Sequence, residues 1–176
     1  MKKFLLLLVI AATALTASAQ DRTDSHGNIV KHDMFEVAQY QIGDFDAAKT
    51  TGCYGLGLVT TSLSHWDRFH VGAAVSFSLN YGLADDDGCI VDFGPSVRYD
   101  LGEHIFVNVP VTAVCVATFP EGTTDTKTKW GARIAPSLHV FLSDKFGIFA
   151  GPQMSLSFES GSEASFGLQA GLSYAF

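Results

Sequence analysis

Beyond residue 15, this 176-residue chain has no apolar run of the about 20 residues that a membrane-crossing helix needs. Charged residues make up only 16% of the chain, and 18 acidic side chains outnumber 11 basic ones. The net charge of −7 argues against nucleic acid as a partner, because binding phosphates requires a basic surface. Histidine and cysteine lack the spacing of metal ligands, and no phosphate-binding glycine loop is present. The sequence therefore predicts neither a metal nor a cofactor.

The N-terminus has the three parts of a secretory signal peptide. A basic start precedes an apolar run from Phe4 to Leu15 and the small residues 17–19. We expect residues 1–19 to be this signal and residues 20–32 to be a polar periplasmic leader. An N-terminal membrane helix is the alternative, but the apolar run is shorter than a span requires.

The last twelve residues, 165–176, alternate strictly between apolar even positions and small or polar odd positions. Successive side chains of a strand point to opposite faces, so this segment predicts a strand with one apolar and one polar face. The first of the predicted strands is the least regular, because Glu36 falls at an even position like the apolar residues of that strand. This irregularity predicts a bulge or a shifted register. Similar patterns recur along the chain and predict eight strands, near residues 33–43, 52–63, 68–81, 89–101, 104–117, 129–142, 145–158 and 165–176.

The connections between these segments also alternate, being tight after the second, fourth and sixth strands and longer and more polar after the others. Outward aromatic residues gather at both ends of the strands, as in the aromatic girdles of membrane barrels. An exported chain of this profile enters a membrane only as a closed barrel, because lipid cannot satisfy an open sheet edge. The predicted fold is an all-β, eight-stranded antiparallel up-and-down transmembrane β-barrel over residues 33–176. A soluble lipocalin-like barrel is the rival fold, with its apolar residues inside.

The chain ends on Phe176, with Tyr174 two residues earlier, and in this it resembles the small eight-stranded outer-membrane β-barrel proteins of the OmpX and OmpA-barrel type. The resemblance covers the chain after the signal peptide. It implies that Tyr174 and Phe176 form the signal read by the barrel-assembly machinery. It further implies a monomer surrounded by the lipid of a bacterial outer membrane, with both termini in the periplasm. No periplasmic domain follows the barrel, unlike in the OmpA type, and the loops are shorter than those of adhesive OmpX-type members.

Charged side chains also occur on the predicted inner face. The lumen of an eight-stranded barrel is just filled by side chains, and charges within it must pair to offset their desolvation. We therefore predict a polar network that closes the lumen, with a narrow pore as the alternative. Its charged members are predicted to be Arg68, Asp92, Arg98, Asp100, Lys129 and Arg133.

The sequence predicts a non-enzymatic role in envelope structure or surface interaction. The alternatives are a narrow, porin-like channel and a lipid-modifying outer-membrane enzyme. Some barrels of this size modify lipid with a histidine, a serine and an acidic residue on the barrel surface, and here Ser137 and His139 share a strand face. His70 is similarly close to Ser76 and Ser78. No nucleophile motif supports these pairs, so no catalytic residue is predicted.

The chain has three cysteines, and an odd number in an exported protein leaves at least one thiol free. If three residues form the turn between the fourth and fifth strands, Cys89 and Cys115 lie directly opposite each other. The sequence then predicts a disulfide between them, with Cys53 free. A register displaced by one step would instead pair Val91 with Cys115.

Overall fold

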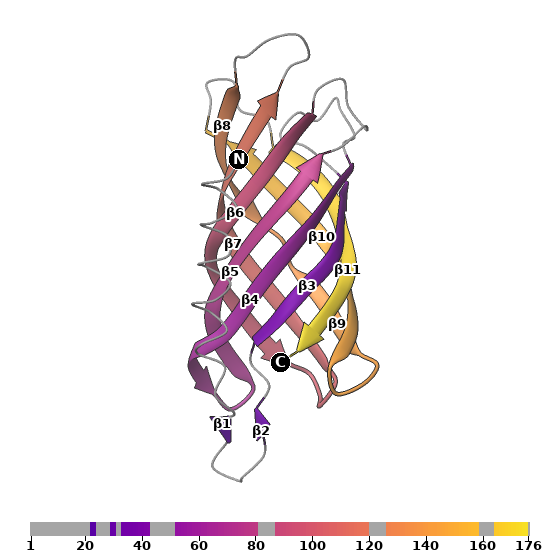
Figure 1. Cartoon of the computed structure of the whole chain (residues 1–176). Coiled ribbons are helices and arrows are strands. Elements are labelled where there is room, and N and C mark those ends of the chain that lie inside the picture. The colour runs from indigo at the N-terminus through magenta and orange to yellow at the C-terminus, as the bar shows by residue number, and fades with distance from the viewer. Residues whose placement is uncertain are drawn as a thin grey trace.

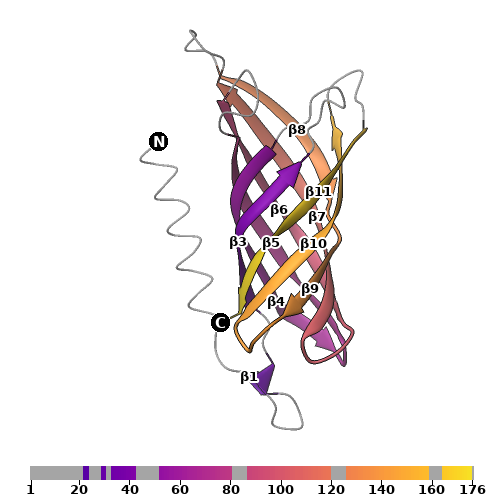
Figure 2. The same cartoon turned by 90° about the vertical axis from the view of Figure 1, so that its right-hand side faces the viewer.

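The strands of the computed structural model form one closed antiparallel barrel (Figures 1 and 2). The structure describes residues 22–23, 29–30, 33–42, 52–80, 87–119, 126–158 and 164–175. Among these residues, no helix is long and apolar enough to span a membrane. The predicted signal peptide, most of the leader and Phe176 lie outside the described residues.

Nine strands make up the barrel wall, and β11 pairs with β3 to close it. Both β8 and β9 pair with β7 on one side and β10 on the other, so they are two halves of one barrel strand, and the wall is eight-stranded as predicted. A separate two-residue pair, β1 (Arg22–Thr23) with β2 (Ile29–Val30), precedes the barrel. The wall strands are β3 (Asp33–Ile42), β4 (Gly52–Trp66), β5 (Phe69–Asn80), β6 (Asp87–Asp100), β7 (Ile105–Phe119), β8 (Lys127–Ile134), β9 (Ser137–Phe141), β10 (Phe146–Ser157) and β11 (Ala164–Ala175).

The alternation of side chains along the strands separates the two faces of the wall. In β11, Phe166 and Leu168 are 73% and 62% exposed, whereas Ser165 of the same strand is 4% exposed. In β9, Leu138 is exposed and Ser137 is buried. The predicted arrangement, with apolar residues outside and small or polar residues inside, is therefore confirmed for these strands. A lipocalin-like barrel would show the reverse.

The first wall strand contains the predicted irregularity. Glu36 pairs with Ser173, and Tyr40 pairs with Ala170, so the register between β3 and β11 shifts by one residue between these two pairs. The register between β3 and β4 shifts over the same stretch, between Glu36 and Gln39. This bulge moves Glu36 out of the alternation set by its apolar neighbours.

Four of the five prolines of the chain lie at neighbouring positions on successive wall strands, and we call this group the proline seam: Pro95 on β6, Pro110 on β7, Pro136 between β8 and β9, and Pro152 on β10. Proline lacks the N–H that a sheet ladder requires. The predicted strand 129–142 is consequently interrupted at residues 135–136, although β8 and β9 keep the same register against β7. One ladder contact persists there, since the Ala135 N–H donates to the Pro110 carbonyl at 3.2 Å.

The register of β6 against β7 corrects the predicted disulfide. Asp100 pairs with Phe106, so the connection is longer than the three residues assumed from the sequence. Val91 therefore lies opposite Cys115, while Cys89 lies opposite Ala117. Both thiols are free in the structure. The predicted bridge between them is wrong, because Cys115 pairs with Val91, two residues along β6 from Cys89. Nothing is described for the side chain of Cys53.

Three tight turns lie at one end of the barrel, at residues 67–68, 101–104 and 142–145. The end of β11 lies at this same end (Figure 1). The connections predicted to be longer fall at the opposite end and lie largely outside the described residues.

Candidate functional site

The lumen is the candidate site, because the wall directs its chemically active side chains inward. Alternation brings one residue in two to the inner face of each strand, and the sequence supplies small or polar residues at most of these positions. The buried polar residues of the described part are His70, Ser76, Ser78, Asp92, Ser96, Asn108, Thr112, Arg133, Ser137, His139, Gln153, Ser155, Ser165, Gln169 and Ser173.

An ion pair between Asp92 and Arg133 is buried on the inner face of the wall. Arg133 Nη1 lies 2.8 Å from Asp92 Oδ2, and Arg133 Nε donates to Ser155 Oγ at 3.1 Å. Asp92 belongs to β6 and Arg133 to β8, so the pair passes over the inner face of β7. The two residues are only 6% and 5% exposed. Charges so completely desolvated are stable together, whereas either one alone is costly.

A second charged group lies nearer the tight turns. Arg98 Nε donates to Asp100 Oδ1, and the other oxygen of this carboxylate is 2.8 Å from His70 Nε2. His70 and Arg98 occupy directly paired positions on β5 and β6. The Asp100 carboxylate therefore ties β5 to β6 where both strands approach the turns.

Arg98 also caps a stack of rings that fills the lumen at this level. Its guanidinium lies 3.9 Å from the centre of the Phe106 ring. The Phe106 ring stacks on His139 at 4.7 Å, and His139 stacks on Phe149 at 5.0 Å between ring centroids. Cross-strand pairing produces this stack, since Phe106 pairs with His139 and His139 pairs with Phe149. We call these four side chains the aromatic plug.

His139 at the centre of the aromatic plug is fully buried and is held at both ring nitrogens. Its Nε2 is 3.0 Å from Ser137 Oγ, and its Nδ1 is 3.1 Å from Ser173 Oγ. The pair Ser137 and His139 noted in the sequence thus makes a real contact. It lies inside the barrel, however, with both residues buried, rather than on the surface that meets lipid.

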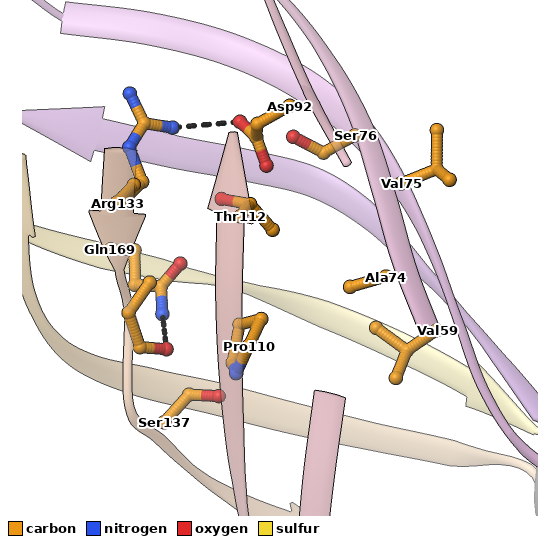
Figure 3. Close-up of a pocket in the computed structure, with 11 residues that line it drawn as sticks. Val59, Ala74, Val75, Ser76, Asp92, Pro110, Thr112, Arg133, Ser137 and Gln169 are labelled. Atoms are coloured by element: carbon orange, nitrogen blue, oxygen red, sulfur yellow. Dashed lines mark hydrogen bonds and ion pairs between the residues drawn. The ribbon is translucent and has the colours of Figure 1, made fainter. Parts of the chain in front are cut away.

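Beside the ion pair is a small cavity of about 20 Å³ (Figure 3). This volume accommodates about one water molecule. Asp92, Arg133 and Thr112 line one part of it, as Figure 3 shows. Gln169 lies at its edge and donates through Nε2 to the Ala135 carbonyl at 2.8 Å, beside the proline seam. This cavity therefore has room for a water molecule but not for a larger ligand.

Two of the residues predicted for the network lie elsewhere. Arg68 is exposed in the turn between β4 and β5, and Lys129 is exposed near the outer end of β8. The prediction that they belong to the closed lumen is wrong. An even or odd position in a strand predicts which face a side chain is on, but not how far along the barrel axis the residue lies. The structure does bring Asp92 together with Arg133, and Arg98 together with Asp100.

The sequence analysis did not identify the inward aromatic residues as part of the site. Phe106 and Phe149 interrupt inner faces whose other residues are mostly small or polar. The available signal was their position: each is close to a tight turn, on strands that lie on either side of His139. Of the predicted assembly signal, Tyr174 packs its ring against Phe146 at 5.0 Å between centroids, and Phe176 is outside the described residues.

The fold is a small eight-stranded antiparallel barrel with a polar lumen, the architecture that the sequence resemblance implied. The structure is similar to Neisserial surface protein A, NspA, with a TM-score of 0.58, 12% identity, and coverage of 84% of this chain and 98% of that one. It is also similar to the N-terminal β-barrel domain of Pseudomonas aeruginosa OprF, with a TM-score of 0.54, 12% identity, and coverage of 83% and 98%. A third similar structure is the attachment invasion locus protein Ail of Yersinia pestis, with a TM-score of 0.54, 11% identity, and coverage of 84% and 100%. No protein-family model and no curated protein sequence matches the chain.

Proposed function

We propose that this chain is an integral protein of a bacterial outer membrane with a non-enzymatic role in envelope structure or surface interaction. The observation that carries the proposal is the apolar outer face of a closed barrel, where Phe166, Leu168 and Leu172 are each more than half exposed. Exposed apolar surface on this scale marks contact with lipid or a partner. Closure of the wall satisfies the backbone groups that lipid cannot.

We further propose that both chain ends face the periplasm and that the protein is a monomer in the outer-membrane lipid. The tight turns at one end support this orientation, since membrane barrels have short periplasmic turns and longer external loops. The barrel-assembly machinery is the proposed partner during insertion, through the C-terminal strand with Tyr174 and Phe176.

The filled lumen supports a barrel that does not conduct. The Asp92–Arg133 pair and the aromatic plug occupy two successive levels of the described lumen. Planar-bilayer recordings of the purified protein test this. We expect no reproducible large, long-lived openings, and such openings would favour the channel alternative.

The lipid-modifying alternative needs a Ser–His pair that a lipid can reach. Ser137 and His139 are 4% and 0% exposed and face the lumen, where His139 is covered on both ring faces. This placement argues against these two residues as a catalytic pair for a lipid substrate.

Membrane insertion is tested with an environment-sensitive fluorophore on a single cysteine, after the three native cysteines are replaced. Leu138→Cys reports the proposed lipid face, and Ser137→Cys is the matched control on the inner face of the same strand. We expect lipid-like emission from position 138 only. Water-like emission at 138 with lipid-like emission at 137 would overturn the proposal.

A further inference from the structure

The three tight turns share one sequence pattern. Each has an acidic residue followed directly by a basic one, and exposed apolar residues flank this pair on both sides. We call these pairs the turn dipeptides: Asp67-Arg68, Glu103-His104 and Asp144-Lys145, all six exposed. The flanking residues are Trp66 and Phe69, Leu101 and Ile105, and Leu142 and Phe146, with exposed fractions between 38% and 73%.

The basic residue of each dipeptide occupies the same structural position. The carbonyl of Arg68 accepts the N–H of Asp100 at 2.8 Å, and the carbonyl of His104 accepts the N–H of Phe141 at 2.8 Å. The carbonyl of Lys145 likewise accepts the N–H of Ala175 at 2.8 Å. Each bond links a turn to the neighbouring hairpin or to the last strand, so the three basic residues are anchored equivalently around the rim.

The first dipeptide, Asp67-Arg68, presents a negative and a positive side chain to the surroundings. No ion pair is recorded for Asp67, Arg68 or Glu103 with any described residue. Asp67 has a φ of 52°, a conformation that aspartate and asparagine adopt more readily than most residues. The turn thus holds an acid and a base side by side at the edge of an apolar surface.

We infer that the first turn dipeptide, Asp67-Arg68, binds the headgroup of a zwitterionic ethanolamine phospholipid in the periplasmic leaflet, which rests on the proposed membrane function. The basic residue complements the phosphate, and the acidic residue complements the ammonium group. The flanking apolar residues lie where the acyl chains begin. A primary ammonium donates three hydrogen bonds, whereas the quaternary ammonium of choline donates none, so the site favours ethanolamine over choline headgroups.

Trp66 adjoins the first dipeptide and provides a direct reporter. The chain has two tryptophans, so Trp130→Phe leaves Trp66 as the only one. This variant is reconstituted in mixed vesicles in which either the phosphatidylethanolamine or the phosphatidylcholine carries brominated acyl chains, which quench nearby tryptophan. We expect Trp66 to favour phosphatidylethanolamine by about two- to fivefold, the range of an exposed ion pair.

In the same background, Asp67→Asn with Arg68→Gln removes both charges while keeping two polar side chains and a residue suited to the φ of position 67. We expect the preference to fall to about onefold. The matched control, Asp144→Asn with Lys145→Gln, changes a turn on another part of the rim and should leave the preference at Trp66 unchanged. Rescue by Asp67→Glu with Arg68→Lys is also expected.

Equal quenching by both lipids in the Trp130→Phe protein overturns the inference and leaves membrane insertion intact. Stronger quenching by brominated phosphatidylglycerol than by phosphatidylethanolamine also overturns it, since the basic residue would then act alone. Absence of quenching by any brominated lipid overturns the membrane function itself together with this inference.

Discussion

Replacing Arg133 by methionine should destabilise the barrel severely. The substitution keeps much of the side-chain length but leaves the Asp92 carboxylate, 6% exposed, without the cation that lies 2.8 Å from it. Removing one partner of a buried ion pair typically costs about 3–5 kcal/mol, because the remaining charge stays desolvated. It also removes the 3.1 Å hydrogen bond to Ser155. We therefore expect the free energy of unfolding to fall by about 3–5 kcal/mol.

Lys129→Met provides the matched control, since Lys129 is a basic residue on the same face of the same strand but is exposed. Its effect should stay within about 0.5 kcal/mol. Adding Asp92→Leu to Arg133→Met should recover much of the loss, because the lone charge is gone. Urea unfolding in phospholipid vesicles, followed by tryptophan emission, measures all four proteins. Equal losses from Arg133→Met and Lys129→Met would refute the reasoning.

Three further substitutions test the packing and the register. Phe106→Ala removes a ring that is 3% exposed from the aromatic plug and should cost about 3–5 kcal/mol in the same urea assay; a loss below about 1 kcal/mol would contradict the packing. Gly151→Ala would bring a Cβ into collision with the backbone carbonyl oxygen of Pro136 and should cost about 1–3 kcal/mol, whereas Gly102→Ala meets nothing within 4 Å and should be neutral. Val91→Cys places a thiol directly opposite Cys115, which is free in the structure, and should form a disulfide between positions 91 and 115. Mass spectrometry of the unreduced, alkylated variant should show no alkyl group on either cysteine. Full alkylation of both would argue against this register.

The strands and their faces could be predicted because both follow from a local rule, the two-residue period of a strand. Phe166 and Ser165 illustrate this, as adjacent residues with opposite exposure. The register between β6 and β7 could not be predicted, because it depends on the length of one turn. The alternation is equally satisfied when Cys115 lies opposite Cys89 or opposite Val91. A displacement of the pairing by two residues leaves every side chain on the same face of the sheet.

Depth along the barrel is the second property that the alternation does not contain. Lys129 and Arg133 share a strand and a face, yet one is exposed and the other pairs with Asp92. They differ because Arg133 lies within reach of a partner, Asp92, on a strand about 40 residues earlier. The aromatic plug was missed for a related reason, because its rings come from separate strands and only the register of β7, β9 and β10 brings them together.

In the proposed non-conducting barrel, the ion pair and the aromatic plug fill the lumen by different physics, and this bears on how the barrel would fail. The Asp92–Arg133 pair depends on electrostatics, so removal of one charge destabilises it sharply. The aromatic plug depends on close packing of rings, with His139 held at both nitrogens by Ser137 and Ser173. The cavity beside the ion pair has room for about one water and is bounded by polar groups of that pair. Loss of either level alone therefore leaves the other across the lumen, and a closed barrel does not rest on a single contact.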